Sequence, residues 1–126
     1  MSPERLEAKD PTALTEFGYL LETFVVGELM KQASWLDGIA GYGHWRTHDG
    51  DEVDLIIERD DGAVVAFEVK ASARVPGQGM RSLAKLRDAV GPAFIAGVAL
   101  YLGSRSYTFA ERLLVLPVER IWTPVD

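Results

Sequence analysis

The chain has 126 residues, of which 48% are hydrophobic, and a formal net charge of −6. This length and apolar content predict one domain with one core. No apolar run approaches the roughly 20 residues of a membrane span, and the N-terminus is charged rather than signal-like, which together predict a soluble, cytoplasmic protein that does not enter a membrane.

The composition also limits the ligands that the chain could bind. Because the chain has no cysteine, disulfides and thiolate metal sites are excluded, and a bound metal would use carboxylate or imidazole ligands. That restriction favours Mg²⁺ or Mn²⁺ over zinc. The acidic net charge opposes phosphate binding over the whole surface, so any affinity for nucleic acid must be local.

Hydrophobic spacing predicts two helices and a series of strands. A helix-start signal at Asp10-Pro11-Thr12 is followed by apolar residues at helical spacing, which predicts a long helix from Ala13 to Ser34. Strands are expected at Tyr42 to Thr47, Glu52 to Arg59, Ala63 to Lys70, Ala93 to Leu102 and Leu113 to Leu116, with a second helix at about Met80 to Val90 and a strand or turn at Pro117 to Trp122. This order predicts an α/β fold with a mixed sheet flanked by helices.

The hairpin between the second and third strands can close in two registers. A two-residue turn at Asp61-Gly62 would mix polar and apolar side chains on each face. A three-residue loop with Gly62 in the left-handed conformation instead gathers the apolar side chains on one face. That face would contain Val53, Leu55, Ile57, Val65, Phe67 and Val69. We therefore predict the three-residue loop.

The predicted register brings charged side chains together on the opposite face. Asp54 would face Glu68, and Glu52 would face Lys70. Facing carboxylates repel each other unless a cation or a proton lies between them, so the register predicts a metal site. The alternative is that Asp54, Glu68 and Lys70 form weak ion pairs on a solvated strand face. Because acidic residues are unfavourable in strands, their presence here favours a functional role.

Asp54, followed after thirteen residues by Glu68-Val69-Lys70, resembles the PD-(D/E)xK motif of restriction-endonuclease-like nucleases. Val53 stands where that motif has its nominal proline. The predicted order of elements is similar to the αβββαβ core of these nucleases. In addition, the stretch GYLLE that ends at Glu22 resembles the acidic first-helix motif of Holliday-junction-resolvase-like members.

Nearly the whole chain also resembles the C-terminal domain that follows the ATPase module in many prokaryotic AAA-type ATPases. The matching stretches are GYLLETFVVGELMKQASW, GDEVDLIIERDDGAVVAFEVKAS, LRDAVGPAFIAGVALYLG and RLLVLPVERIW. In place of the ATPase module this sequence has about a dozen leading residues, so three explanations stay open: a free-standing gene, a relic, or an excised domain. No glycine-rich phosphate loop is present in it. This resemblance implies a nuclease-like domain with an AAA-type ATPase as a partner.

The first helix offers two glutamates, Glu22 and Glu28, which point about 120° apart and cannot both reach one site. The apolar stripe is expected to contain Leu14, Phe17, Leu21, Phe24, Val25 and Leu29. On a helical wheel Glu28 lies near its middle and Glu22 on its edge. An edge position suits a ligand of a half-exposed metal, so Glu22 is the predicted site residue. Glu28 is expected to be the more buried, with a backbone amide, an arginine or Trp35 as its partner.

Two further groups of residues are weaker candidates. The histidines His44 and His48 flank the first strand without the spacing of a zinc site, and we expect them to be exposed. Basic residues follow Lys70 along the chain, at Arg74, Arg81, Lys85 and Arg87. Arg74, Arg81 and Lys85 could meet phosphates near the metal, although a solvated helix face explains these basic residues equally well.

The nuclease resemblance implies a division of roles. Asp54 and Glu68 would hold Mg²⁺ or Mn²⁺ with the main-chain carbonyl of Val69, and Glu22 would bind the metal through water or shape a second ion site. Lys70 would orient the attacking water and stabilise charge on the phosphate. The expected reaction is hydrolysis of phosphodiester bonds in nucleic acid, with DNA as the first choice.

The competing hypothesis is a catalytically inactive module of the same fold that binds a partner protein or DNA, accessory to an AAA-type ATPase. A homodimer is left open.

Overall fold

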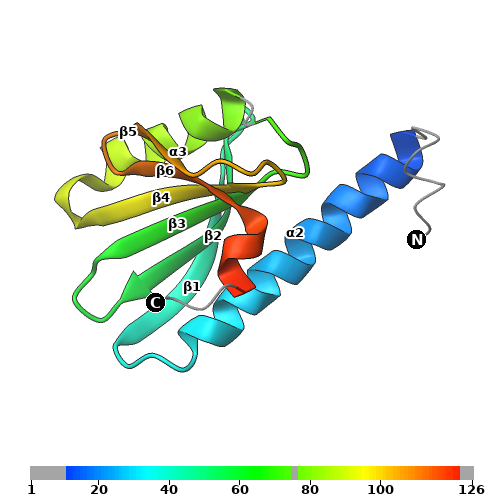
Figure 1. Cartoon of the computed structure of the whole chain (residues 1–126). Helices are drawn as coiled ribbons and strands as arrows, with labels where there is room; N and C mark the ends of the chain where they lie inside the picture. Colours follow the sequence, from blue (N-terminus) through cyan, green and yellow to red (C-terminus); the bar gives the residue numbers. More distant parts are fainter. Residues whose placement is uncertain (1–10, 75–76, 123–126) are drawn as a thin grey trace.

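The computed structural model of the protein describes residues 11–74 and 77–122, and it contains a six-stranded sheet with one long helix on each face (Figure 1). The helices are α2 (Pro11–Ala33) and α3 (Gly77–Val90). The strands are β1 (Ile39–Arg46), β2 (Glu52–Arg59), β3 (Val64–Val69), β4 (Phe94–Tyr101), β5 (Tyr107–Ala110) and β6 (Leu113–Pro117). Two short 3₁₀ helices are η1 (Gly91–Ala93) and η2 (Val118–Trp122). The predicted α/β class is confirmed. Within the described ranges, no helix has the length and apolarity needed to cross a membrane.

The sheet is mixed, with the strand order β1-β2-β3-β4-β6-β5. Strands β3, β4 and β6 are parallel to one another, whereas β1, β2 and β5 each join their neighbours in antiparallel fashion. Parallel neighbours need a crossover, and α3 supplies the one between β3 and β4. The carboxyl ends of the three parallel strands therefore lie at one edge of the sheet.

Each face of the sheet has its own core. On the α3 face the buried residues include Val53, Ala66, Met80, Leu83, Phe94, Leu113 and Val115. On the α2 face they include Val25, Leu29, Leu55, Ile57, Val69, Val98 and Leu100. A strand that is buried on both faces reads as a continuous apolar run rather than an alternation. This explains the sequence FIAGVALY of β4.

The predicted hairpin closure is confirmed. Gly62 has φ +85°, in the left-handed region, and the amide of Arg59 donates to the carbonyl of Ala63 across the three-residue loop, at 2.9 Å. The pairs Leu55–Phe67 and Ile57–Val65 form as predicted. The paired part of the β2–β3 hairpin ends at Leu55–Phe67, so the predicted backbone pairs of Val53 with Val69 and of Asp54 with Glu68 are not formed.

One face assignment in the hairpin was wrong. Val53 packs in the core under α3, whereas Leu55 packs in the core under α2. The cause is a β-bulge: Gly43 pairs with Ile56 and Trp45 with Val53, so two β2 residues oppose one β1 residue. A bulge changes which face the following side chains point to. Because both faces of the sheet are apolar, the hydrophobic pattern of the sequence could not reveal it.

Two element boundaries differ from the predictions by about three residues, and one strand was not predicted. The helix α3 begins at Gly77 rather than near Met80, and β1 begins at Ile39 rather than Tyr42. The strand β5 was not predicted, because its four residues are mostly exposed at the sheet edge and give no core pattern. Asp10 of the predicted helix start lies outside the described residues, and so do residues 75–76 before α3.

Gly97 tests how tightly β4 packs under α3. A Cβ at Gly97 would lie 2.9 Å from Phe94 Cζ and 3.1 Å from Leu113 Cδ2. We expect Gly97→Ala to lower the free energy of unfolding by about 1–3 kcal/mol, because a close-packed core accommodates an added methyl group only by strain. Urea denaturation measures this change. Gly41→Ala is the matched strand control, since a Cβ there would meet no atom within 4 Å. Equal losses in both variants would contradict the packing described.

Candidate metal centre

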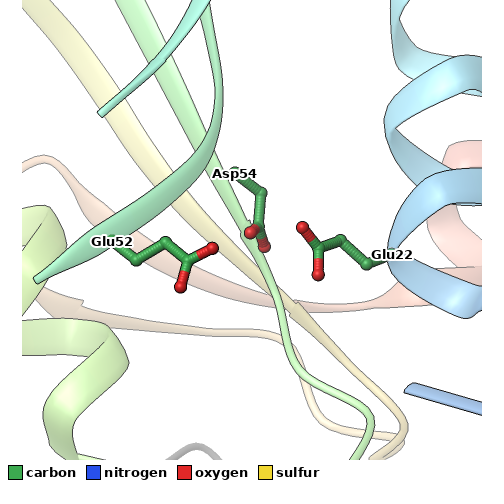
Figure 2. A group of neighbouring side chains, drawn as sticks. All are labelled: Glu22, Glu52 and Asp54. Carbon is green, nitrogen blue, oxygen red and sulfur yellow. The ribbon is translucent and has the colours of Figure 1, made fainter. Parts of the chain in front are cut away.

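Three carboxylates meet where α2 crosses the bulged end of β2. Glu22, Glu52 and Asp54 each offer an oxygen, and these oxygens lie within 4.8 Å of one another. Figure 2 shows the carboxylates of Glu22 and Asp54 pointing toward each other, with Glu52 approaching from the other side of Asp54. All three residues are half-buried. The site is therefore open to a small ion but only partly open to water.

Glu68 and Lys70 complete the site from β3 and its end. The Glu68 side chain is only 4% exposed, and its Oε2 lies 3.9 Å from Lys70 Nζ. Both side chains pass next to Gly79 of α3, where an added Cβ would lie 2.6 Å from Lys70 Cε and 3.7 Å from Glu68 Cγ. The lysine thus occupies space that only a glycine leaves free, and α3 confines it beside the carboxylates.

Asp54 connects Glu22 and Glu52 on one side with Glu68 and Lys70 on the other. Its Oδ2 accepts a hydrogen bond from the backbone amide of Val69 at 2.7 Å. The β2–β3 pairing has already ended at this point, so the Asp54 side chain takes a backbone donor that regular pairing would otherwise use. Val69 lies between Glu68 and Lys70, and this bond therefore fixes Asp54 relative to both.

The crowding of carboxylates changes their acidity. Burial, a hydrogen bond with Asp54 and the negative charge of Asp54 raise the pKa of Glu22 to about 7. Burial raises the pKa of Glu68 far above its usual range, and Asp54 adds to the rise while Lys70 opposes it. At neutral pH and without a cation, protons held between close carboxylates relieve the repulsion. A divalent cation could take the place of those protons.

The predicted site residues are brought close together, but not in the predicted arrangement. Asp54 reaches Glu22 on α2, whereas Glu68 and Lys70 lie beside Gly79 on α3. The three carboxylates that have oxygens within 4.8 Å of one another include Glu52 rather than Glu68. Glu52 was expected to face Lys70 and was not predicted as a ligand. Its position two residues before Asp54 on the same strand is the sequence signal that could have identified it.

The choice of Glu22 over Glu28 agrees with the geometry, but the helical wheel behind it was wrong. Phe24, which was assigned to the apolar stripe, is 61% exposed, while the residues buried on α2 are Val25, Leu29 and Ala33. This rotates the buried stripe toward Glu22 and leaves Glu28 on its edge. Both glutamates are half-buried, so the predicted contrast in burial is not seen. The side chain of Leu14 lies outside the described residues.

The partners predicted for Glu28 are also replaced. The Gln32 side-chain amide donates to Glu28 Oε1 at 3.2 Å and to the carbonyl of Ile121 at 2.6 Å. Gln32 therefore links the edge of α2 to η2, which packs beside that helix in Figure 1. Neither an arginine nor Trp35 is needed to satisfy this carboxylate.

Two of the basic candidates have structural roles instead. Lys85 Nζ lies 2.6 Å from Oδ2 of the buried Asp51, and this hydrogen bond lowers the pKa of Asp51. Arg87 bonds to Asp88 and to the carbonyl of Glu111. Arg74 is exposed, as are the two histidines His44 and His48.

The donors at this site suit a hard divalent cation. All are carboxylate oxygens, and such sets favour Mg²⁺, Mn²⁺ or Ca²⁺ over metals that prefer sulfur or imidazole. The residues present thus fit the ion that the sequence predicted.

Comparison with known families gives one result. The model of a family described as Domain of unknown function (DUF4143) matches residues 17–121. This range includes every residue of the site. The comparison with curated proteins gives no match.

The raised pKa of Glu22 predicts how stability depends on pH without metal. Between its usual value of 4.5 and its folded value of about 7, the native state binds more protons than the unfolded state. The free energy of unfolding should therefore fall as pH rises through this window, and Glu68 shifts in the same direction. Urea denaturation in a chelating buffer between about pH 5 and 8 measures this slope.

Glu22→Gln is the control for this pH dependence, since it removes one of the titrating groups and should flatten the slope. Asp51 and Asp61 do not interfere, because their pKa values are lowered and they titrate at more acidic pH. A wild-type stability that stays constant or rises across the window would show that Glu22 and Glu68 do not have raised pKa values in the folded protein.

Proposed function

Because the chain belongs to the domain family DUF4143, whose description assigns no function, we propose a function from the site itself: hydrolysis of nucleic-acid phosphodiester bonds with Mg²⁺ or Mn²⁺. The observation that carries the proposal is the position of Asp54, which meets Glu22 and Glu52 on one side and Glu68 on the other. Such crowding is unfavourable without a counter-charge. Lys70, beside these carboxylates, supplies a positively charged group that can stabilise the negative charge on a phosphate.

Each residue has a role in this proposal. Asp54, Glu68 and the carbonyl of Val69 would hold the ion, with Glu22 and Glu52 as further carboxylate donors. When bound, the ion supplies an activated water and a Lewis acid for a phosphate oxygen. Lys70, held by Gly79 near Glu68, would orient the nucleophile and stabilise the negative charge that develops on the phosphate. The buried acid Glu68 would keep the lysine ammonium in place.

The resemblance of Asp54, Glu68 and Lys70 to the PD-(D/E)xK motif supports the same reaction class. So does the place of Glu68 and Lys70 in the fold, at the carboxyl end of the parallel strand β3, because α/β proteins commonly bind their ligands at this edge of the sheet. Asp54 lies near the start of the neighbouring antiparallel strand β2, at the same edge. We take DNA as the first substrate to test.

The second candidate is a non-catalytic module that docks onto a partner such as an AAA-type ATPase. The observation that favours it is the outer side of α2, where Tyr19 is 71%, Leu20 59% and Phe24 61% exposed. Apolar side chains gathered on one side of a helix are common in protein–protein contacts. The two candidates differ in whether the carboxylate site binds a metal.

Asp54→Asn separates them. Neutralising Asp54 removes repulsion with Glu22 and Glu68, so the variant should be more stable than the wild type in a chelating buffer. The amide oxygen can still accept the hydrogen bond from Val69. Mn²⁺ should stabilise the wild type, by about 2.7 kcal/mol at a hundredfold excess over Kd, and should not stabilise the variant. Thermal melts with and without Mn²⁺ at fixed ionic strength measure both effects.

Asp37→Asn is the matched control, since it removes the same charge from an exposed position between α2 and β1. It should keep the full response to Mn²⁺. A wild-type melting temperature that does not respond to millimolar Mn²⁺ would remove the basis for hydrolysis and make the docking module the better proposal.

Gly79→Ala tests the position of Lys70. The added methyl group would displace the flexible lysine side chain rather than the backbone, so we expect cleavage of DNA to fall at least about tenfold with little change in melting temperature. Gly77→Ala, at the start of the same helix, would meet no atom within 4 Å and serves as the control. Full activity in Gly79→Ala would argue against a catalytic role for Lys70 in this position.

A further inference from the structure

A pocket lies at the same edge of the sheet as the carboxylates, beside the segment that follows Lys70. It has a volume of about 370 Å³ and is lined by Ala73, Arg74, Tyr101, Arg105 and Tyr107; we call it the arginine pocket. Two backbone hydrogen bonds hold the segment against the end of β4: the amide of Lys70 donates to Leu100 at 2.8 Å, and the amide of Leu102 donates to Ser72 at 2.9 Å.

The loop that carries Arg105 is built around the Tyr101 ring. The Tyr101 hydroxyl donates to the carbonyl of Arg105 at 2.8 Å and accepts from its amide at 3.0 Å. The ring also packs on Gly103, where an added Cβ would lie 2.3 Å from Tyr101 Cε2. Because both backbone groups of Arg105 are fixed in this way, its side chain starts from a defined position at the rim of the pocket.

Among the described residues, the two arginines of the pocket have no acidic partner. Several other basic residues do: Arg46 pairs with Glu52, Arg59 with Asp61, Lys85 with Asp51 and Arg87 with Asp88. Within residues 11–74 and 77–122, neither Arg74 nor Arg105 forms an ion pair, and both are exposed. Two unpaired guanidinium groups at one hollow, in a chain of net charge −6, indicate an anionic ligand.

The aromatic lining adds a second kind of recognition. Tyr107 is 41% exposed at the edge strand β5, and an exposed aromatic ring beside arginines suits stacking with an unpaired base. Arg74 follows Lys70 by four residues, so their Cα atoms are at most about 14 Å apart. Both residues can therefore contact one strand within a few nucleotides.

We propose that the arginine pocket binds a single-stranded nucleic-acid segment next to the phosphate that is cleaved, with Arg74 and Arg105 on its phosphates and Tyr107 against a base. The link to cleavage rests on the proposed function, whereas the binding itself does not. The acidic centre and the basic pocket would then act on neighbouring positions of one strand.

The test is the affinity of a fluorescently labelled single-stranded DNA of about 12 nucleotides, within the site sizes of single-strand binding proteins, measured by anisotropy with Ca²⁺ present. We expect Arg74→Ala and Arg105→Ala to weaken binding by about tenfold each. The double variant should reduce the slope of log K against log salt by about 1.4, or 0.7 for each lost phosphate contact. Tyr107→Ala should also weaken binding, and more for single-stranded than for duplex DNA.

Arg59→Ala/Arg120→Ala is the charge-matched control and should bind DNA almost as the wild type does. Equal affinities of the two double variants would overturn the proposal, because the effect would then come from net charge alone. Complete displacement of the DNA by millimolar inorganic phosphate would also overturn it, because the pocket would then recognise a single anion.

The Mn²⁺ melts keep this proposal separate from the proposed function. If Mn²⁺ does not stabilise the protein but DNA binding depends on Arg74 and Arg105, hydrolysis fails and the pocket stands. If Mn²⁺ stabilises the protein and the arginine variants bind DNA unchanged, the pocket fails and the metal centre stands.

Discussion

The carboxylate of Asp54 is held close to the carboxylates of Glu22, Glu52 and Glu68 in a place that water only partly reaches, and most local features of the structure follow from this constraint. The bulge in β2 turns Asp54 toward α2, where Glu22 meets it. The backbone amide of Val69 donates to it and so ends the regular hairpin pairing. Glycine at position 79 leaves room for Lys70, the cation nearest to Glu68. At each of these places regular packing or pairing is interrupted, and charged groups lie close together instead.

The fold brings opposite charges to one edge of the sheet. The carboxylates lie at the ends of β2 and β3, and the arginine pocket lies beyond the ends of β3 and β4. Both groups therefore lie at the sheet edge formed by the carboxyl ends of β3 and β4 and the amino end of β2, where side chains from different elements converge. A local basic pocket explains how a protein with net charge −6 could attract a phosphate chain without a basic surface. A bound cation would reduce the repulsion between that chain and the acidic centre.

Much of the fold could be predicted because local patterns and tertiary contacts agree there. The turn at Gly62 requires a left-handed residue, and the register of Leu55 with Phe67 follows from that turn. The apolar run of β4 likewise indicates a buried strand, and the spacing in α2 indicates a helix, although it did not identify which side of that helix is buried. By contrast β5 was missed, since a four-residue edge strand exists only because β6 is beside it.

The sequence by itself determined the α/β class, the main helices and strands, the hairpin turn, and the candidate residues Asp54, Glu68, Lys70 and Glu22. Only the tertiary structure decided the face of Val53, the exposure of Phe24 and the place of Glu52 among the carboxylates. The physical reason is that the sheet is buried on both faces. An apolar side chain is then stable on either face, so hydrophobicity no longer distinguishes the two faces. A one-residue bulge can therefore move a side chain to the other face without changing the hydrophobic pattern of the sequence.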